Sequence, residues 1–391
     1  MVFLKTTSNF NFLIDGSDFN VDLNNSDTIN ISSSPRDYKV TFTDNVASKI
    51  DLNNGKYSDY IFIADKNIMK IYPNLLDNFN NYPTYIVEAI EDNKNIHEAL
   101  RICDFLLENN ANRGTCIYAL GGGIIQDLVA YAAATYKRGI PWIYIPTTLL
   151  GQSDSCVGGK TGLNYNGTKN LIALFSAPRE IIIDINFNYT LNGDDIFSGY
   201  GEILRLAITG GEQVFLQYKK LIHHLISNDS LLKPDKEILN QLIKLSLSVK
   251  KSVVEYDEFE LNHRKSMNYG HSIGHAIEAM VDFKIPHGQA VALGIMVENE
   301  LAKSILDLSS DIISDVKDIV MKIVPKESLD YFFSLKNSSF IKFLKRDKKV
   351  IGSNLKLAII SRIGDMRFID FSLDKVSDKH INETIKNLSQ M

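Results

Sequence analysis

The sequence predicts an α/β N-terminal domain with a mostly parallel sheet, followed by an all-helical C-terminal domain. Three observations support this prediction. Short apolar runs typical of buried strands alternate with helical segments up to about residue 191. A Gly-Gly-Gly turn at 121–123 joins one of these strands to a helix. Beyond residue 192 the strand patterns fade and long amphipathic helices follow one another.

Length and composition restrict the class of protein. At 391 residues the chain is long enough for two domains. No apolar run reaches the roughly 20 residues that a membrane span requires, and the N-terminus lacks the pattern of a secretory signal. The sparse, odd set of Cys103, Cys116 and Cys156 indicates reduced thiols and a cytoplasmic location. With a net charge of −5, no nucleic-acid partner is expected, and an anionic substrate would need a local basic cluster.

Three regions are predicted along the chain. Residues 1–37 are rich in Asn, Ser and Asp, and either a loose extension or a small added hairpin fits them. The α/β domain covers 38–191 and the helical domain 192–391. In the α/β domain, apolar runs and alternation predict strands at 38–43, 60–64, 115–120, 142–145 and 180–184, and helices at 96–109 and 124–136.

In the helical domain, amphipathic patterns predict helices at 241–254 and 289–306, among others. Lys250 borders an apolar stripe of the first of these helices, so its stem should be partly buried. A buried ammonium group needs an anion, which makes Lys250 a candidate for binding one.

The segment from Asn268 to His287 concentrates three of the eight histidines. His271 and His275 are four residues apart and would project from one face of a helix. If that helix extends backwards, Arg264 and Asn268 continue the same polar stripe, which is typical of the lining of a cavity. The alternative is a partly exposed helix with histidines bonded to the backbone, because no His-Glu-x-x-His signature is present.

Two other features each have two interpretations. The turn Gly121-Gly122-Gly123 joins a strand to a helix. It can hold a phosphate at the helix N-terminus, or it is a tight turn with no ligand. Glu202 is a candidate metal ligand, or one partner of an ordinary surface ion pair with Arg205 at i, i+3.

A series of short motifs runs from about residue 38 to 365. The motifs are Gly121-Gly122-Gly123-Ile-Ile-Gln-Asp127, Tyr136-Lys-Arg138-Gly, Pro146-Thr-Thr-Leu-Leu, Asp154-Ser-Cys-Val-Gly-Gly-Lys160-Thr-Gly, Lys169-Asn170, Gly201-Glu202-Ile-Leu-Arg205, Lys250, Arg264 with Asn268-Tyr-Gly-His271, His275, His287-Gly and Arg346-Asp-Lys348-Lys349. In this order they resemble the 3-dehydroquinate synthases and their relatives among the sugar phosphate cyclases. The resemblance implies a dehydroquinate synthase-like fold whose N-terminal domain is Rossmann-like.

The resemblance also implies ligands and roles for individual residues. It implies zinc or cobalt at Glu202, His271 and His287, with Pro286 and the helix after it holding His287 at a helix start, and two His with one carboxylate leave coordination positions open. The implied NAD contacts are Asp65, Glu91, Lys94, Gly122, Gly123, Asp127, Thr147, Thr148, Lys169 and Thr190. The implied catalytic residues are Asp154, Lys160, Arg205, Lys250, Arg264, Asn268 and His275, and the implied substrate-binding residues are Arg138, Asn170 and Lys348.

The resemblance implies an enzyme, a carbon–oxygen lyase acting on phosphates. Its reaction would be the NAD- and zinc-dependent cyclisation of a seven-carbon keto acid phosphate (DAHP) with phosphate elimination. This reaction belongs to the shikimate pathway of aromatic amino acid biosynthesis. In the family the residue matching Arg138 reaches the site from the partner subunit, so a homodimer is expected.

The chain departs from the family pattern at Gln126, where Gly is usual, and at Arg205, where Lys is usual. These departures leave open a retuned or non-catalytic paralogue, and a related cyclase acting on sedoheptulose 7-phosphate, amino-DAHP or glucose 6-phosphate. Asn268 and His275 favour the dehydroquinate synthase within that group. A polyol or glycerol-phosphate dehydrogenase of the same fold is the third alternative, and Lys160, Arg264 and the Asp-Lys-Lys set speak against it.

Overall fold

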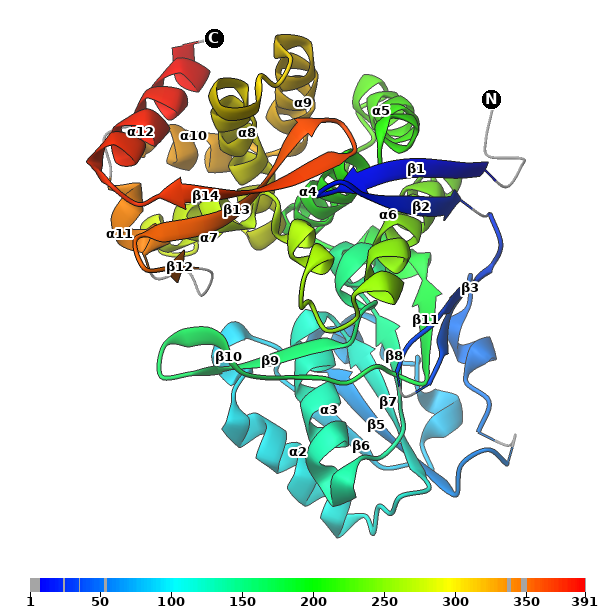
Figure 1. Ribbon diagram of the computed structural model, residues 1–391. Coiled ribbons are helices and arrows are strands. Elements are labelled where there is room, and N and C mark those ends of the chain that lie inside the picture. Colours follow the sequence, from blue (N-terminus) through cyan, green and yellow to red (C-terminus); the bar gives the residue numbers. More distant parts are fainter. Residues whose placement is uncertain are drawn as a thin grey trace. The chain divides into compact units, whose positions relative to one another are not determined.

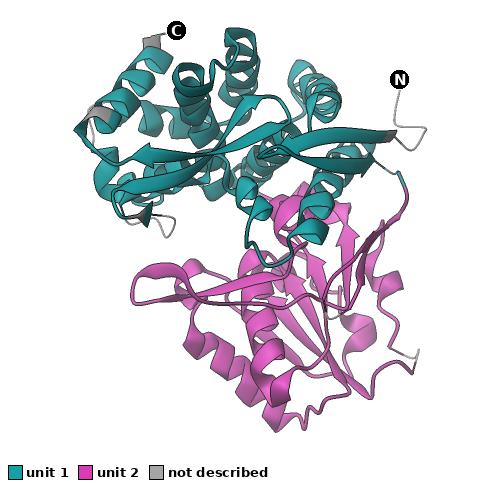
Figure 2. Cartoon of the chain, in the orientation of Figure 1, with its two compact units in different colours: residues 1–25, 192–391 teal, residues 26–191 magenta. Residues whose placement is uncertain are grey.

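The computed structural model describes residues 8–23, 25–34, 36–52, 55–335, 339–345 and 350–390. The chain divides into two compact units (Figure 2). Residues 26–191 form one unit, called the α/β unit below, and residues up to 25 together with 192–391 form the other, called the helical unit. Among the described residues, no helix is long and apolar enough to cross a membrane.

The α/β unit is built on a seven-stranded sheet in the order β3-β4-β11-β8-β7-β5-β6 (Figure 1). All neighbours in it are parallel except β3 and β4, which confirms the predicted mostly parallel sheet. All seven residues of β7 are buried, as expected of a parallel strand covered on both faces. The strands are β3 Thr28–Ile31, β4 Tyr38–Thr43, β5 Asp59–Asp65, β6 Thr84–Val87, β7 Thr115–Gly121, β8 Trp142–Pro146 and β11 Glu180–Asp184.

Three α-helices and a separate hairpin also lie in the described part of this unit. The helices are α1 Lys66–Ile71, α2 Ile96–Glu108 and α3 Gly123–Thr135, and the hairpin consists of β9 Lys160–Tyr165 and β10 Thr168–Phe175. α3 packs on β7, β8 and β9, while α2 packs on α3. The buried face of α2 consists of Glu98, Ala99, Ile102 and Leu106.

The carboxyl ends of the central strands place the expected cofactor residues along one edge of the sheet. β5 ends at Asp65, β7 at Gly121, β8 at Pro146 and β11 at Asp184. In parallel sheets these ends lie on the same side, which is where ligands of α/β proteins bind. The edge therefore carries Asp65, Gly122, Thr147 and the segment leading to Thr190.

Helices α4 to α12 make up most of the helical unit, so the helical character of the C-terminal region is confirmed. They are α4 Gly193–Thr209, α5 Glu212–Ser227, α6 Lys236–Tyr256, α7 His271–Met280, α8 His287–Leu306, α9 Ser310–Ile323, α10 Lys326–Ser334, α11 Phe340–Leu344 and α12 Lys375–Gln390. α8 is the central helix: it is buried along most of its length and packs against α4, α7, α9 and α12.

The expectation of an all-helical C-terminal domain needs one correction. The helical unit also contains a five-stranded sheet in the order β12-β13-β14-β1-β2. Its strands are β1 Ser8–Ile14, β2 Ser17–Leu23, β12 Val350–Ile351, β13 Asn354–Arg362 and β14 Asp365–Ser372. β1 and β2 form a hairpin, the second alternative that the sequence left open, and β1 pairs in parallel with β14. Sequence patterns are local and did not reveal this pairing between the two ends of the chain.

The N-terminal hairpin is held by an aromatic cluster. The ring of Phe19 lies 5.3 Å from that of Phe12, 4.8 Å from that of Tyr256 and 5.6 Å from that of His263. Ser17 Oγ and His263 Nε2 are hydrogen-bonded at 3.0 Å. The hairpin therefore supports the segment that leads into Arg264.

Replacing Phe19, which is 4% exposed, by alanine should destabilise the helical unit. The lost packing predicts a decrease of about 3–5 kcal/mol in the free energy of unfolding. Urea denaturation followed by circular dichroism measures this change. Leu216→Ala is the control, because Leu216 is 48% exposed. Equal losses in the two variants would show that the cluster does not anchor the hairpin.

Candidate metal centre and cofactor-binding edge

α4 and α8 touch through their backbones. A Cβ atom on Gly201 would lie 1.9 Å from the carbonyl oxygen of Gly288, and one on Gly288 would lie 1.9 Å from that of Ser198. Only glycine permits this approach. The N–H of Gly288 also donates to Ser198 Oγ at 2.7 Å. The contact brings together the residues next to these glycines, Glu202 and His287.

The chain turns sharply before α7. A 3₁₀ helix covers His263–Asn268, and Gly270 has φ +78° before α7 begins at His271. The N–H of Gly270 donates to Glu298 Oε2 at 2.6 Å. A Cβ atom there would lie 2.7 Å from the carbonyl oxygen of Val291, so a side chain is excluded as well.

This turn corrects the predicted polar stripe. The helix does not run back to Arg264 and Asn268, so only His271 and His275 share it. The spacing of the four residues suits a helix, but the left-handed conformation of Gly270, held by the buried Glu298, ends it.

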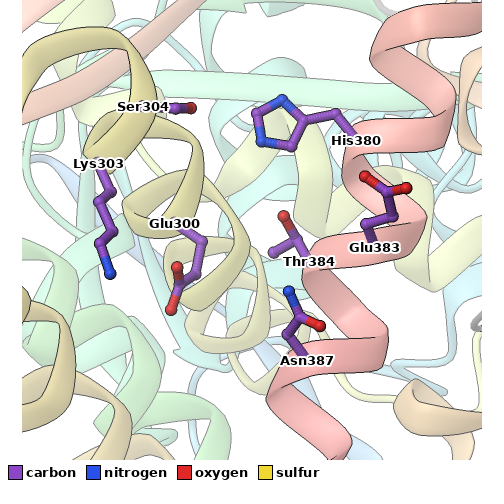
Figure 3. A pocket seen from close by; sticks show the side chains of 7 residues that line it. All are labelled: Glu300, Lys303, Ser304, His380, Glu383, Thr384 and Asn387. Carbon is purple, nitrogen blue, oxygen red and sulfur yellow. The ribbon is translucent and has the colours of Figure 1, made fainter.

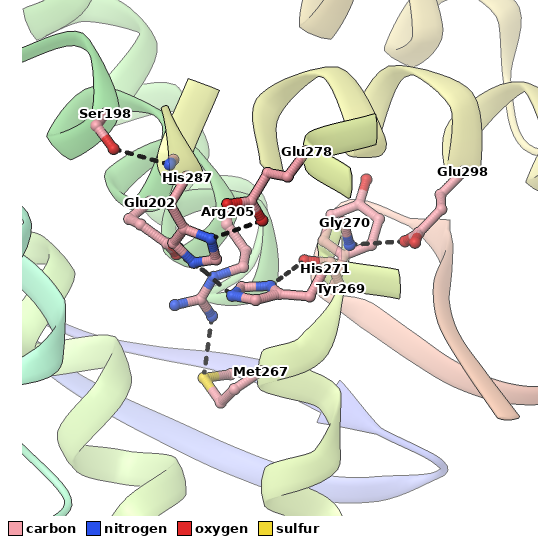
Figure 4. Close-up of polar contacts among 11 residues, drawn as sticks. Ser198, Glu202, Arg205, Met267, Tyr269, Gly270, His271, Glu278, His287 and Glu298 are labelled. Carbon is pink, nitrogen blue, oxygen red and sulfur yellow. Dashed lines mark hydrogen bonds and ion pairs between the residues drawn. The ribbon is translucent and has the colours of Figure 1, made fainter. Parts of the chain in front are cut away.

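Glu202, His271 and His287 converge on one point (Figure 4). Glu202 Oε1 lies 3.4 Å from His271 Nε2 and 3.3 Å from His287 Nε2. Proline precedes His287, which is the first residue of α8, as expected. Two imidazoles and one carboxylate are a donor set that suits zinc or cobalt and leaves coordination positions open.

The second nitrogen of each imidazole has its own partner. His271 Nδ1 lies 3.2 Å from the carbonyl oxygen of Tyr269, and His287 Nδ1 lies 3.2 Å from Glu278 Oε2. Such partners orient metal-binding histidines and fix which nitrogen faces the metal. Glu278 is not among the residues that the sequence predicted for the site. The signal that indicates it is a carboxylate three residues after His275 on the histidine-bearing helix.

Arg205 forms the ion pair with Glu202 that the sequence allowed, but inside the protein. Its Nε lies 2.7 Å from Glu202 Oε2, and the two side chains are 2% and 1% exposed. Arg205 Nη1 also contacts the sulfur of Met267 at 3.6 Å. Glu202 thus presents one oxygen to Arg205 and the other to the two histidines, and the surface-pair interpretation does not apply.

These contacts change the proton affinities of the cluster. Burial opposes ionisation of Glu202, yet Arg205 and the two histidines hold its pKa well below the ordinary value. Burial lowers the pKa of His271, despite the nearby Glu202. For His287 burial acts in the same direction, but hydrogen bonds to Glu202 and Glu278 outweigh it and raise the pKa to about 10. Glu202 is therefore a carboxylate, the form that a metal ligand needs.

The other expected residues of the helical unit have different surroundings. Lys250 is 8% exposed, which confirms its predicted burial. Arg264 is 2% exposed and donates to the carbonyl oxygen of Glu258. Asn268 Nδ2 donates to Glu260 Oε1 at 2.9 Å. His275 is exposed, with its ring 5.5 Å from those of His271 and His287. Lys348 lies outside the described residues.

In the α/β unit, several expected cofactor residues are bonded into one network. Lys94 Nζ lies 2.6 Å from Asp127 Oδ2, both largely buried. Asn164 Nδ2 donates to Glu91 Oε1 at 2.7 Å, and Asn164 Oδ1 accepts the N–H of Asn170 at 3.0 Å. The hairpin residue Asn164 therefore connects an expected cofactor ligand with an expected substrate ligand.

The glycine turn offers space for a phosphate. Gly122 is the N-cap of α3, and a Cβ atom on Gly123 would have no neighbour within 4 Å. This open helix N-terminus suits a dinucleotide phosphate. Thr147 N–H donates to the Gly121 carbonyl oxygen at 3.1 Å, and Thr148 Oγ1 accepts from Gly151 at 3.1 Å.

The remaining expected cofactor residues lie on other elements of the α/β unit. Asp65 caps α1, accepting from Asn67 at 2.9 Å, and Thr190 Oγ1 is 3.0 Å from Tyr72 Oη. Lys169 is exposed on β10.

Gln126, the first departure from the family pattern, is buried and bonded. Its Nε2 donates to the carbonyl oxygen of Ser155 at 2.8 Å, and its Oε1 accepts from Ser155 Oγ at 2.8 Å. Ser155 follows Asp154 in the short helix Gly151–Ser155. Gln126 therefore fixes the segment that carries Asp154, which glycine has no side chain to do. Nearby in sequence, Lys160 is exposed at the start of β9, and Arg138 is exposed in a turn with φ +64°.

A separate cavity of about 360 Å³ lies in the helical unit (Figure 3). Its lining comes from α8 and α12 and consists of Glu300, Lys303, Ser304, His380, Glu383, Thr384 and Asn387. None of these is an expected site residue.

Comparison with known proteins gives concordant matches. The family profile described as 3-dehydroquinate synthase N-terminal matches residues 84–198, and that described as 3-dehydroquinate synthase C-terminal matches residues 199–350. The 3-dehydroquinate synthase of Pelagibacter ubique (strain HTCC1062) is 33% identical over 356 residues, which cover 86% of this chain and 92% of that protein.

Solved structures with the same fold include two sugar phosphate cyclases. 2-Deoxy-scyllo-inosose synthase, in complex with carbaglucose-6-phosphate, NAD⁺ and Co²⁺, has a TM-score of 0.76 at 22% identity, covering 92% of this chain and 99% of that one. 2-Epi-5-epi-valiolone synthase from Streptomyces hygroscopicus subsp. jinggangensis 5008, with NAD⁺ and Zn²⁺ bound, has a TM-score of 0.72 at 21% identity, covering 90% and 97%. At these identities the similarity demonstrates the fold.

Gly288→Ala should disrupt the metal centre, because the new methyl group meets a backbone carbonyl that has no room to move. Overpacking of this kind predicts a loss of about 2–3 kcal/mol in the free energy of unfolding, together with weaker zinc binding. Thermal unfolding and elemental analysis measure the two effects.

Gly193→Ala is the matched control on α4. Its Cβ would meet the side chain of Leu232 at 3.3 Å, and a side chain can shift where a backbone carbonyl cannot. A Gly288→Ala protein with unchanged stability and zinc content would refute the assembly described for this site.

Proposed function

Because the chain belongs to the 3-dehydroquinate synthase family, we propose that it is an NAD- and zinc-dependent cyclase that eliminates phosphate from the seven-carbon keto acid phosphate DAHP. It would act in the shikimate pathway. The observation that carries the proposal is the cluster of Glu202, His271 and His287, which contributes two imidazoles and an ionised carboxylate. The fold neighbours whose structures contain NAD⁺ with Co²⁺ or Zn²⁺ support the same cofactors here.

Each cofactor has candidate ligands in a different unit. Glu202, His271 and His287 would hold zinc or cobalt in the helical unit, and the edge around Gly122 would hold NAD in the α/β unit. When bound, the metal supplies a Lewis acid and NAD supplies a reversible hydride acceptor. Arg205 keeps Glu202 ionised and leaves a fixed positive charge beside it.

The substrate would carry two anionic groups, bound by different residues. Arg264 offers a planar fork suited to a carboxylate, with Lys250 near the same end of the substrate. The candidate phosphate ligands are Lys160 and Asn170 in the α/β unit and Asn268 and His275 in the helical unit; Lys348, outside the described residues, stays a prediction. His275 is exposed, so its ring is accessible to a phosphate group.

We also propose a cytoplasmic homodimer in which Arg138 reaches the partner's site. Arg138 is exposed, and Leu171 and Phe175 on strand β10 are 56% and 40% exposed, an apolar surface that a second copy would cover. All three cysteines are free thiols, which suits a reducing compartment.

A related sugar phosphate cyclase, acting on sedoheptulose 7-phosphate, amino-DAHP or glucose 6-phosphate, is the second candidate. Gln126 and Arg205, the two positions where the chain departs from the family pattern, favour it. Gln126 is hydrogen-bonded to Ser155 and Arg205 is paired with Glu202, so both departures contact expected site segments.

The experiment is to incubate the protein with NAD⁺, zinc and either DAHP or sedoheptulose 7-phosphate, and to measure phosphate release. The proposal predicts release from DAHP, no net NADH absorbance, and loss of activity on chelation that zinc or cobalt reverses. Release only from sedoheptulose 7-phosphate would establish the second candidate, and a steady rise in NADH would indicate a dehydrogenase.

Arg205→Lys tests the second departure. A lysine keeps the charge beside Glu202 but loses the planar group that also contacts Met267. Activity on DAHP should stay within about tenfold, a barrier change of roughly 1.4 kcal/mol.

Arg205→Met is the matched control, because it removes the charge and leaves the buried carboxylate of Glu202 without a partner. The free energy of unfolding should fall by about 3–5 kcal/mol. If Arg205→Lys instead creates DAHP activity that the natural protein lacks, the native substrate is a different sugar phosphate.

A further inference from the structure

His287 has a carboxylate at each of its ring nitrogens. Glu202 Oε1 lies 3.3 Å from Nε2, and Glu278 Oε2 lies 3.2 Å from Nδ1 (Figure 4). The Glu278 side chain is 6% exposed, and that of His287 is 37% exposed. Glu278 comes from α7 and His287 begins α8, and these two helices pack closely against each other.

We propose that Glu278 is a positioning residue for the metal of the proposed function. Its carboxylate accepts the proton on Nδ1 of His287, which leaves the lone pair of Nε2 directed at the metal position. The same arrangement serves His271, whose Nδ1 faces the carbonyl oxygen of Tyr269. The negative charge of Glu278 also makes the imidazole of His287 a stronger donor than a carbonyl partner would.

A competing assignment places Glu278 in direct contact with the metal. Glu278, His275 and His287 also bring ligand atoms within 4.8 Å of one another. In that arrangement His287 would bind through Nδ1, the nitrogen that faces Glu278. Donating Nδ1–H to Glu278 and binding a metal through Nδ1 exclude each other, so the two assignments predict different ligands.

Three observations favour the orienting role. Glu202 faces the Nε2 atoms of both His271 and His287, which gives three donors around one point. Arg205 Nε pairs with Glu202 Oε2 at 2.7 Å, so Glu202 keeps Oε1 for the point that both histidines face. His275 is exposed, whereas the side chains of Glu202 and His271 are 1% and 14% exposed; His287, at 37%, belongs to both assignments.

The test is the zinc dissociation constant of the purified full-length protein, measured by competition with a chromophoric chelator. Glu278→Gln keeps the shape of the side chain but removes its charge. It should weaken zinc binding about 10- to 100-fold, the usual effect of losing such a partner. Glu278→Asp keeps the charge and withdraws it by one methylene, so it should give a smaller loss.

Two further variants separate the assignments. His275→Asn should leave the zinc dissociation constant unchanged if Glu278 orients His287, and should weaken it as much as Glu278→Gln does if Glu278 is a ligand. Glu300→Gln, which alters another glutamate of the same unit, controls for charge. The cobalt-substituted Glu278→Gln protein should keep the visible spectrum of the natural protein, because the set of ligand atoms is unchanged.

An unchanged zinc dissociation constant in Glu278→Gln would overturn the inference, and so would an altered cobalt spectrum. The proposed function can fail separately: a natural protein that binds zinc through this cluster but releases no phosphate from DAHP would refute the function and leave the role of Glu278 intact. A natural protein that binds no zinc would refute both.

Discussion

Backbone contact between α4 and α8 is the constraint on which the candidate metal centre depends. Gly201 of α4 and Gly288 of α8 let the two helices approach very closely. A side chain at either position would clash with the backbone of the opposite helix. Because Glu202 follows Gly201 and His287 precedes Gly288, the contact also sets the distance between two of the three metal ligands. The third, His271, is placed by the turn at Gly270, which Glu298 of α8 holds through a hydrogen bond. α8 therefore determines the position of all three ligands.

The charges of the cluster follow from this packing. Burying Glu202 without a partner would cost several kcal/mol, and Arg205 offsets that cost at 2.7 Å. A buried ion pair of this kind is weak support for stability, and its clearest consequence is chemical, because it keeps the carboxylate ionised. Glu278 adds a second buried carboxylate next to His287. With two carboxylates, one guanidinium and two imidazoles, the cluster suits a divalent cation.

The sequence predicted the parts of the structure that depend on local patterns. Buried apolar runs such as 115–120 identified the parallel strands, and the apolar stripe beside Lys250 indicated its burial, which the structure confirms. The pairing of β1 with β14 was missed because it joins residues more than 350 positions apart. The helix break at Gly270 was missed because spacing alone does not reveal a left-handed glycine, and Glu278 because its role appears only when α7 packs on α8. Whether the expected cofactor and substrate residues act as proposed stays a prediction.

If the packing of α4, α7 and α8 builds a metal centre, Glu202, His271 and His287 bind one metal ion. The most direct measurement is an anomalous difference map, recorded at the zinc absorption edge, from crystals of the zinc-loaded protein. We expect a single strong peak about 2.0–2.2 Å from a Glu202 oxygen and from Nε2 of both histidines. A peak beside Glu278 and His275, or no peak at the cluster, would contradict it.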